Sequence, residues 1–366
     1  MARLEIVAPV SDAWRRVPKW ARILIGCAFV AFLLVLPQLK IPVLDTPNSD
    51  FPTLLFYPVG IYVLVAIGLN VVVGEAGLLD LGYVAFFAVG GYSMAMLGTK
   101  LHLPFFLILP AGIALSMVAG VLLGGPTLRL RGDYLAIVTL GFGEIVRIVA
   151  RNTDAIGGPR GINDIPHPPS VHAGPVNLQF RILDPKPYYY LLLVIIILAI
   201  ILVRNLKRSR VGRAWTAIRE DEDAAELMGV PTFRFKLWAF AIGAGIGGSG
   251  GVLYASKVIS ISPDNFLFIL SVLFLSAVVL GGSGNLPGVI LGACVVAYLP
   301  ERFRGFQQYR VMVFGAALVV VMIFRPQGLL PSGRRAQELK QPEPHGGMGG
   351  LGAETGLEQA ATIEDV

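Results

Sequence analysis

The chain has 366 residues, of which 55% are hydrophobic and only 15% are charged, whereas an ordinary soluble domain carries about 25% charged residues. A soluble protein of this length could not bury so much apolar surface, since its exterior must be polar enough to meet water. The composition therefore excludes most soluble enzymes, and it excludes extensive disorder as well.

The net charge of +6 does not indicate nucleic-acid binding, because the basic residues gather between apolar runs and form no stripe with interleaved aromatic residues. Cysteine and histidine indicate no site either. Cys27 and Cys294 lie singly in apolar runs, and no two histidines have the spacing of metal ligands on a helix. We expect no metal and no disulfide.

The apolar runs predict membrane-spanning helices, each of which needs roughly 20 mainly apolar residues. We expect an all-α polytopic membrane protein with about ten transmembrane helices. In chain order the predicted spans are Arg22–Leu36, Leu54–Val73, Gly77–Leu97, Phe105–Gly124, Tyr134–Val149, Tyr188–Val203, Leu237–Tyr254, Phe266–Gly281, Leu286–Leu299 and Val311–Phe324.

The distribution of Lys and Arg predicts the orientation of these spans. With both termini in the cytoplasm, nineteen basic residues lie inside and ten lie outside, as the positive-inside rule requires. Residues 1–21 are then a basic cytoplasmic segment, residues 22–326 the membrane domain and residues 327–366 a glycine-rich cytoplasmic tail, predicted to be disordered. The two long loops are 151–187 outside and 204–235 inside.

The inside loop predicts an amphipathic helix that ends at Gly229 and Pro231. On this helix Ala214, Ile218, Ala225 and Met228 line one face. Such a helix either lies on the bilayer surface or docks in a groove of a cytoplasmic partner. Five acidic residues count against adhesion to anionic lipid and favour the partner: Glu220, Asp221, Glu222, Asp223 and Glu226.

At this loop the chain resembles a known family. Asp223-Ala224-Ala225, followed by Gly229, resembles the "EAA…G" coupling loop of ABC importer permeases, with Asp223 where the pattern has glutamate. Further stretches resemble the LivM-type permease subunit of branched-chain amino acid ABC importers: Gly74–Tyr92, Arg131–Arg147, Gly157–Ile162 and Leu280–Gly292.

The resemblance implies an importer in the bacterial cytoplasmic (inner) membrane. Its other parts would be a second related permease, two ATPase subunits and a periplasmic solute-binding protein. The coupling loop would sit in a cleft of an ATPase through Arg213, Thr216, Arg219, Glu220, Asp223, Ala224, Ala225 and Gly229. The chain contains no G-x-x-x-x-G-K-[ST] phosphate loop. We therefore expect no enzyme activity and no cofactor on this chain, and ATP to be used by the partner subunits.

Three charged residues lie within or near apolar runs: Asp80, Glu144 and Arg147. An ionised group at mid-bilayer costs roughly 2.5–3.5 kcal/mol, so each should face protein or water. Glu144 and Arg147 share a helix face and either pair with each other or line the solute path. Gly74 and Asp80 are further candidates for that path. In the outer loop, Gly157, Gly158 and Arg160 form either a lid without a partner or, as the resemblance implies, a surface facing the binding protein.

Glycines crowd the predicted span Leu237–Tyr254, where they indicate either close helix packing or unwound backbone beside a solute path. The similar turns Gly74–Gly77 and Gly281–Gly284 both fall inside and hint at an internal repeat. The function expected from the resemblance is import of branched-chain amino acids. Alternatives are a urea or short-chain amide permease of the same family and, less favoured because intramembrane acids are few, an ion-coupled secondary carrier.

Overall fold

The computed structural model describes residues 28, 31–38, 50–128, 130, 132–173, 176–178, 180, 184–302, 312, 315–316, 319 and 328–330. Within them the apolar runs form helices, which satisfy every backbone hydrogen bond inside the segment and so suit a chain that cannot hydrogen-bond to lipid. The longer helices are α4 (Ile61–Leu69), α5 (Val84–Thr99), α6 (Phe105–Thr127), α7 (Asp133–Asn152), α8 (Lys186–Arg208), α9 (Arg210–Glu220), α11 (Thr232–Val258), α12 (Phe268–Gly281) and α13 (Leu286–Arg302).

Shorter elements connect or extend these helices. The short helices are η1 (Leu36–Gln38), α3 (Phe51–Leu54), η2 (Leu55–Gly60), η3 (Asn70–Glu75), η4 (Asp154–Ile156), η5 (Gly158–Arg160), α10 (Glu222–Leu227) and η6 (Pro263–Phe266). Strands β1 (Val171–Ala173) and β2 (Val176–Leu178) form one antiparallel pair in which Ala173 is opposite Val176. This hairpin is a small departure from the expected all-α fold.

Five helical segments of the described chain are long and apolar enough to cross a membrane. They are Phe51–Glu75, Phe105–Thr127, Lys186–Arg208, Thr232–Val258 and Pro263–Gly281. Helices α7 and α13 lie where the fifth and ninth spans are predicted. The predicted spans Arg22–Leu36 and Val311–Phe324 lie largely outside the described residues, as do both termini. The count of ten spans and the orientation of the termini therefore remain predictions.

The predicted span Gly77–Leu97 is wrong in its first third. Helix α5 begins only at Val84, and Gly77–Tyr83 is not helical. Side chains from other helices satisfy the backbone here: the N–H of Leu81 donates to Thr139 Oγ1 at 3.0 Å, and the N–H of Val84 donates to Ser271 Oγ at 2.9 Å. Hydropathy alone cannot reveal this irregular stretch, because most of its residues are as apolar as those of the spanning helices.

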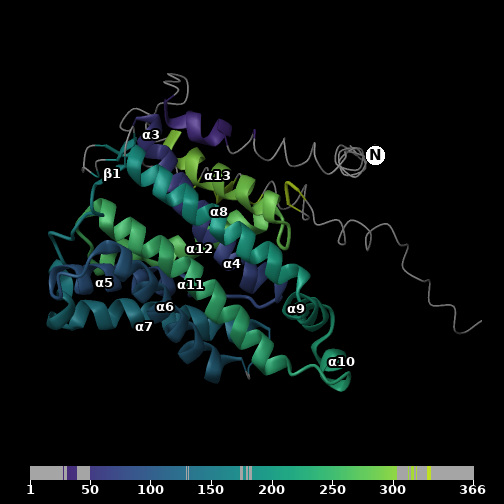
Figure 1. Ribbon diagram of the computed structural model, residues 1–366. Helices are drawn as coiled ribbons and strands as arrows, with labels where there is room; N and C mark the ends of the chain where they lie inside the picture. The colour runs from purple at the N-terminus through teal and green to yellow at the C-terminus, as the bar shows by residue number, and fades with distance from the viewer. Residues whose placement is uncertain are drawn as a thin grey trace, which may run out of the picture.

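Helix α11 runs through the middle of the bundle and packs on α4, α5 and α6 (Figure 1). Its glycines lie directly against neighbouring helices. A Cβ on Gly251 would lie 1.9 Å from the backbone carbonyl oxygen of Phe87, and one on Gly248 would lie 2.0 Å from the side-chain Oγ of Ser116. The helix is unbroken from Thr232 to Val258, so close packing explains these glycines and no unwound backbone is needed.

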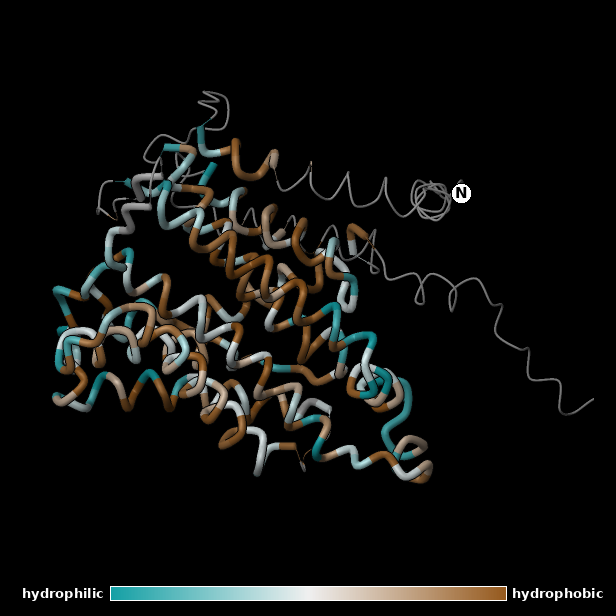
Figure 2. Tube along the Cα trace, viewed as in Figure 1, coloured by the Kyte–Doolittle hydropathy of each residue, from teal (hydrophilic) through white to brown (hydrophobic). Residues whose placement is uncertain are grey.

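Helices α12 and α13 pack on each other and on α4, and α8 also packs on α4. Helices α9 and α10 project from one end of the bundle, which we call the α9–α10 end (Figure 1). Apolar residues predominate along the helices, and hydrophilic residues are concentrated at α9 and in the connecting loops (Figure 2). The polar α9–α10 end is therefore the part of the bundle best suited to contact a soluble protein.

Candidate functional site

Helix α9 is held against the bundle by its apolar face. Ser209 caps its first turn by accepting the N–H of Val211, as serine commonly does at this position. Trp215 is buried, and its indole Nε1 donates to the carbonyl oxygen of Phe235 at 2.7 Å. Ile218 is buried on the same face. Since Phe235 lies in the first turn of α11, α9 is fixed to the start of the central helix.

The loop contains two helices instead of the single predicted helix. Asp221 is extended (φ −154°, ψ 112°), and its Oδ1 accepts the N–H of Ala224 at 3.0 Å. A carboxylate in this position caps a new helix and suits its positive end. Helix α10 therefore starts in a new direction. The prediction that Met228 shares a face with Ala214 and Ile218 is wrong, because those two residues are buried and Met228 is exposed.

Helix α10 divides its residues between a buried and an exposed side. Ala225 is buried, whereas the side chains of Leu227 and Met228 are 89% and 84% exposed. Gly229 then ends the segment at φ +82°, a conformation that glycine adopts without strain. Two adjacent large apolar side chains are thus exposed at the polar α9–α10 end, and exposed apolar surface of this kind is typical of a contact with a partner.

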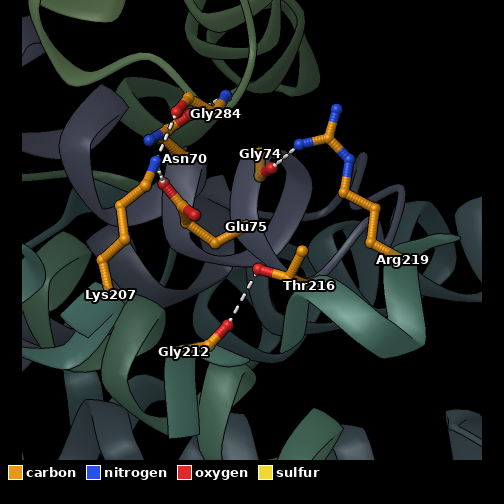
Figure 3. Close-up of polar contacts among 8 residues, drawn as sticks. All are labelled: Asn70, Gly74, Glu75, Lys207, Gly212, Thr216, Arg219 and Gly284. Atoms are coloured by element: carbon orange, nitrogen blue, oxygen red, sulfur yellow. Dashed lines mark hydrogen bonds and ion pairs between the residues drawn. The ribbon is translucent and has the colours of Figure 1, made fainter. Parts of the chain in front are cut away.

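The two glycine turns meet beside α9 (Figure 3). The N–H of Gly284 donates to Asn70 Oδ1 at 2.9 Å, so the turn between α12 and α13 is joined to η3. Lys207 Nζ lies 2.7 Å from Glu75 Oε1 and 2.7 Å from the carbonyl oxygen of Gly284. A lysine from the end of α8 thus bridges both turns.

Arg219 fixes α9 to the same cluster. Its guanidinium donates to the carbonyl oxygen of Gly74. A Cβ on Gly77 would lie 2.8 Å from Arg219 Cγ, and one on Gly284 would lie 2.8 Å from Arg219 Nη1. Both glycines also have positive φ, +74° and +81°. Glycine is required here both for the backbone conformation and for the space that Arg219 fills. We call Asn70, Gly74, Glu75, Lys207, Arg219 and Gly284 the turn cluster.

Only two residues predicted as functional, Gly74 and Arg219, belong to the turn cluster. Thr216 hydrogen-bonds within its own helix, to the carbonyl oxygen of Gly212 at 3.0 Å. Arg213, Glu220, Asp223 and Ala224 are exposed on α9 and α10. Three members of the turn cluster were not predicted from the sequence: Asn70, Glu75 and Lys207. Glu75 carried a signal, because an acid at the end of an apolar span needs a cation, and the basic inside loop supplies one.

Asp80 lies in the irregular segment before α5 and is fully buried. Its Oδ1 accepts the N–H of Gly82 at 2.9 Å, and among the described residues its Oδ2 has no hydrogen-bond partner. The neighbouring Tyr83 donates its hydroxyl to the carbonyl oxygen of Gly243 at 2.6 Å. Asp80 thus helps to begin α5 and does not join Gly74.

Glu144 and Arg147 pair on α7, with Arg147 Nη2 2.8 Å and Nε 2.9 Å from Glu144 Oε2. Arg147 Nη1 also lies 3.8 Å from Asp264 in η6. The side chains of Arg147 and Glu144 are 19% and 32% exposed, so neither is sealed in the core. The pairing anticipated from their spacing is present, and Asp264 is a third member that the sequence did not indicate.

Gly157, Gly158 and Arg160 lie near the C-terminal end of α11, whereas α9 and α10 adjoin its N-terminal end. Gly157 and Gly158 have φ of +97° and +52°, and Arg160 is exposed. Ile162 exchanges backbone hydrogen bonds with Ile261 at 2.8 and 3.0 Å. The loop is therefore tied to the connection between α11 and η6.

The sequence is similar to a family of transport proteins. The family model described as "Branched-chain amino acid transport system / permease component" matches residues 52–322. The high-affinity branched-chain amino acid transport system permease protein LivM of Salmonella typhimurium is 43% identical over 303 residues, covering 78% of this chain and 71% of the relative. LivM of Escherichia coli K12 is 40% identical over 332 residues, covering 85% and 76%.

A shorter similarity relates the chain to another permease of the same description. The high-affinity branched-chain amino acid transport system permease protein LivH of Escherichia coli K12 is 32% identical over 127 residues, covering 34% of this chain and 41% of the relative. No solved structure shows a significant match to the chain.

Proposed function

The chain belongs to the family of branched-chain amino acid transport permeases, and from that membership we propose that it is one of two permease subunits in an ATP-driven importer of branched-chain amino acids. The similarity both to LivM and, over a shorter stretch, to LivH supports a pairing with a second, related permease. Two ATPases and a periplasmic binding protein complete the importer, and the permeases lie in the bacterial cytoplasmic membrane.

The α9–α10 end carries this proposal. Leu227 and Met228 project from α10, and α9 is anchored through Arg219 and Trp215 to a glycine turn and to α11. An amphipathic segment that is exposed on one side and fixed to the spans on the other suits a docking element for a moving partner. We assign α10 as the helix that enters an ATPase cleft, with this end in the cytoplasm.

The face of α7 around Glu144 and Arg147 is the best candidate for the solute path. Charged side chains that are partly exposed on a membrane helix must meet water or protein, because lipid contact is too costly. A zwitterionic amino acid needs one positive and one negative partner, and the trio with Asp264 supplies both. The path then runs between this face and the second permease, and the loop with Gly157, Gly158 and Arg160 faces the binding protein.

Uptake of labelled leucine, urea and acetamide tests the proposal, in cells with and without this chain and with ATP depleted as a control. We expect loss of the chain to abolish ATP-dependent leucine uptake alone. Loss of urea or acetamide uptake would replace the solute. Leucine uptake that survives ATP depletion but collapses with the proton gradient would overturn the ATPase coupling. Purification of the tagged chain should also recover an ATPase.

A further inference from the structure

A buried lysine connects α10 to the central helix. Lys236 lies in the second turn of α11 with its side chain only 3% exposed, and its Nζ forms an ion pair with Glu222 Oε1 in the first turn of α10. A lysine is rarely buried to this degree unless it is paired. Removing Glu222 would leave the charge of Lys236 buried without a partner, which is costly, so the positions of the two helices are coupled through this pair.

A cavity lies beside this pair, between the first turn of α10 and the turn that precedes α5. It has a volume of about 220 Å³ and is lined by Glu222 and Lys236 together with Gly77–Leu79, Leu130, Gly132 and Leu135. Close packing normally fixes one element on another, but on the cavity side the first turn of α10 has no packed neighbour. On that side the ion pair is the contact that joins this turn to α11.

The end of α11 that holds Lys236 also receives the bond from α9. Trp215 donates to the carbonyl oxygen of Phe235, the residue just before Lys236. Further along, the glycines of α11 are packed so closely on α5 and α6 that a shift of α11 must carry those helices with it. A displacement of the first turn of α11 is therefore passed into the bundle and is not absorbed locally.

We propose that the Glu222–Lys236 ion pair passes the movement of α10 to α11, and so links the ATPase cycle to opening of the solute path. This inference rests on the proposed function, because it takes α10 as the docking helix. The two residues act as positioning residues: neither touches solute or nucleotide. The cavity beside them gives α10 room to move, and the pair makes α11 follow.

The test uses the complete importer, purified with its ATPases and reconstituted in vesicles, with leucine transported per ATP hydrolysed as the readout. Glu222→Gln and Lys236→Met each remove one charge, and Glu222→Lys with Lys236→Glu exchanges the two. Arg234→Met is the matched control, since Arg234 lies two residues from Lys236 and is exposed. We expect each single variant to lose at least tenfold in leucine per ATP while basal ATP hydrolysis persists. The exchanged pair should recover most of the loss, and Arg234→Met should match the unaltered importer.

A pair that merely stabilises the fold would behave differently. Its loss would lower the melting temperature of the complex but leave leucine per ATP unchanged in the molecules that assemble, and that result would overturn the proposal. If Glu222→Gln does not assemble, because it leaves the charge of Lys236 buried without a partner, Lys236→Met decides alone, since the Glu222 that it leaves behind is partly exposed. Failure of the proposed function is recognised separately, since the unaltered importer would then transport no leucine.

Discussion

Arg219 is the residue through which α9 contacts the glycine turn at Gly74. A hydrogen bond from a charged donor contributes about 1.5–3 kcal/mol, which is enough to decide how α9 sits on the bundle. We expect Arg219→Ala to lower leucine uptake at least tenfold with an unchanged amount of chain in the membrane, as measured by transport and immunoblot. Arg204→Ala, which removes an exposed arginine from α8, is the control. Equal uptake by the two variants would argue against a role for the Gly74 contact.

Gly284 combines a positive φ with a crowded setting. An alanine there would be strained at φ +81°, and its Cβ would lie 2.8 Å from Arg219 Nη1 and 3.0 Å from the carbonyl oxygen of Gly74. Backbone strain of this kind costs about 1–3 kcal/mol. We expect Gly284→Ala to lower the melting temperature of the purified chain clearly. Gly125→Ala, at a helical position with nothing within 4 Å, should leave it unchanged or raised. A melting temperature for Gly284→Ala equal to that of Gly125→Ala would contradict the tight turn.

At the scale of the element, α10 has one exposed side, which we propose as the docking surface, and one side that packs against the bundle. Leu227 is 89% exposed and Ala225 is 5% exposed. We expect Leu227→Asp to abolish recovery of the ATPase with the tagged chain while the fold is retained, because a charge would enter an apolar contact. Ala225→Arg should instead disturb α10 itself and lower stability. ATPase recovery that is normal for Leu227→Asp would rule out docking through this residue.

The loop that we propose as the docking element is recognisable in the sequence, but its internal geometry is only partly predictable from it. The sequence places an amphipathic segment between Ser209 and Pro231, and Ala214 and Ile218 are buried as expected. The prediction of a single helix is wrong at Asp221, because the helical spacing of apolar residues continues across the break. Its signal was present: an aspartate followed by Glu222 and Asp223 is typical of a helix start. No comparable signal in the sequence predicts the burial of Lys236, since its burial depends on how α10 folds back against the start of α11.

At the scale of the whole molecule, α11 packs against its neighbours with no space for an added side-chain atom at its glycines. A Cβ on Gly251 would lie 1.9 Å from the carbonyl oxygen of Phe87 and 2.7 Å from the N–H nitrogen of Gly91, and backbone atoms cannot rotate away. We expect Gly251→Ala to yield little folded protein in detergent, as judged by size-exclusion chromatography. Gly141→Ala, with nothing within 4 Å, should yield a normal amount. A folded Gly251→Ala chain would show that α11 can separate from α5.

The sequence predicts most of the bundle, because a helix that spans a membrane needs only length and apolar composition. It does not predict the turn cluster. Lys207 and Glu75 are separated by 132 residues and meet only after α8 packs on α4. The two glycine turns were recognised as similar, yet their contact through Asn70 and Gly284 follows from the tertiary arrangement alone. Pairwise contacts of this kind leave no periodic pattern in a single chain.

The irregular segment before α5 has a consequence for how the protein is made. The N–H of Val84 depends on the hydroxyl of Ser271, which is synthesised 187 residues later. A growing chain is delivered to the membrane from its N-terminal end, so this donor enters the bilayer region long before its acceptor exists. An unsatisfied N–H in lipid costs several kcal/mol, and the early segment must therefore wait in a hydrated or protein-sheltered place. The start of α5 can therefore take its final hydrogen bonds only after α12 has been synthesised and packed beside it.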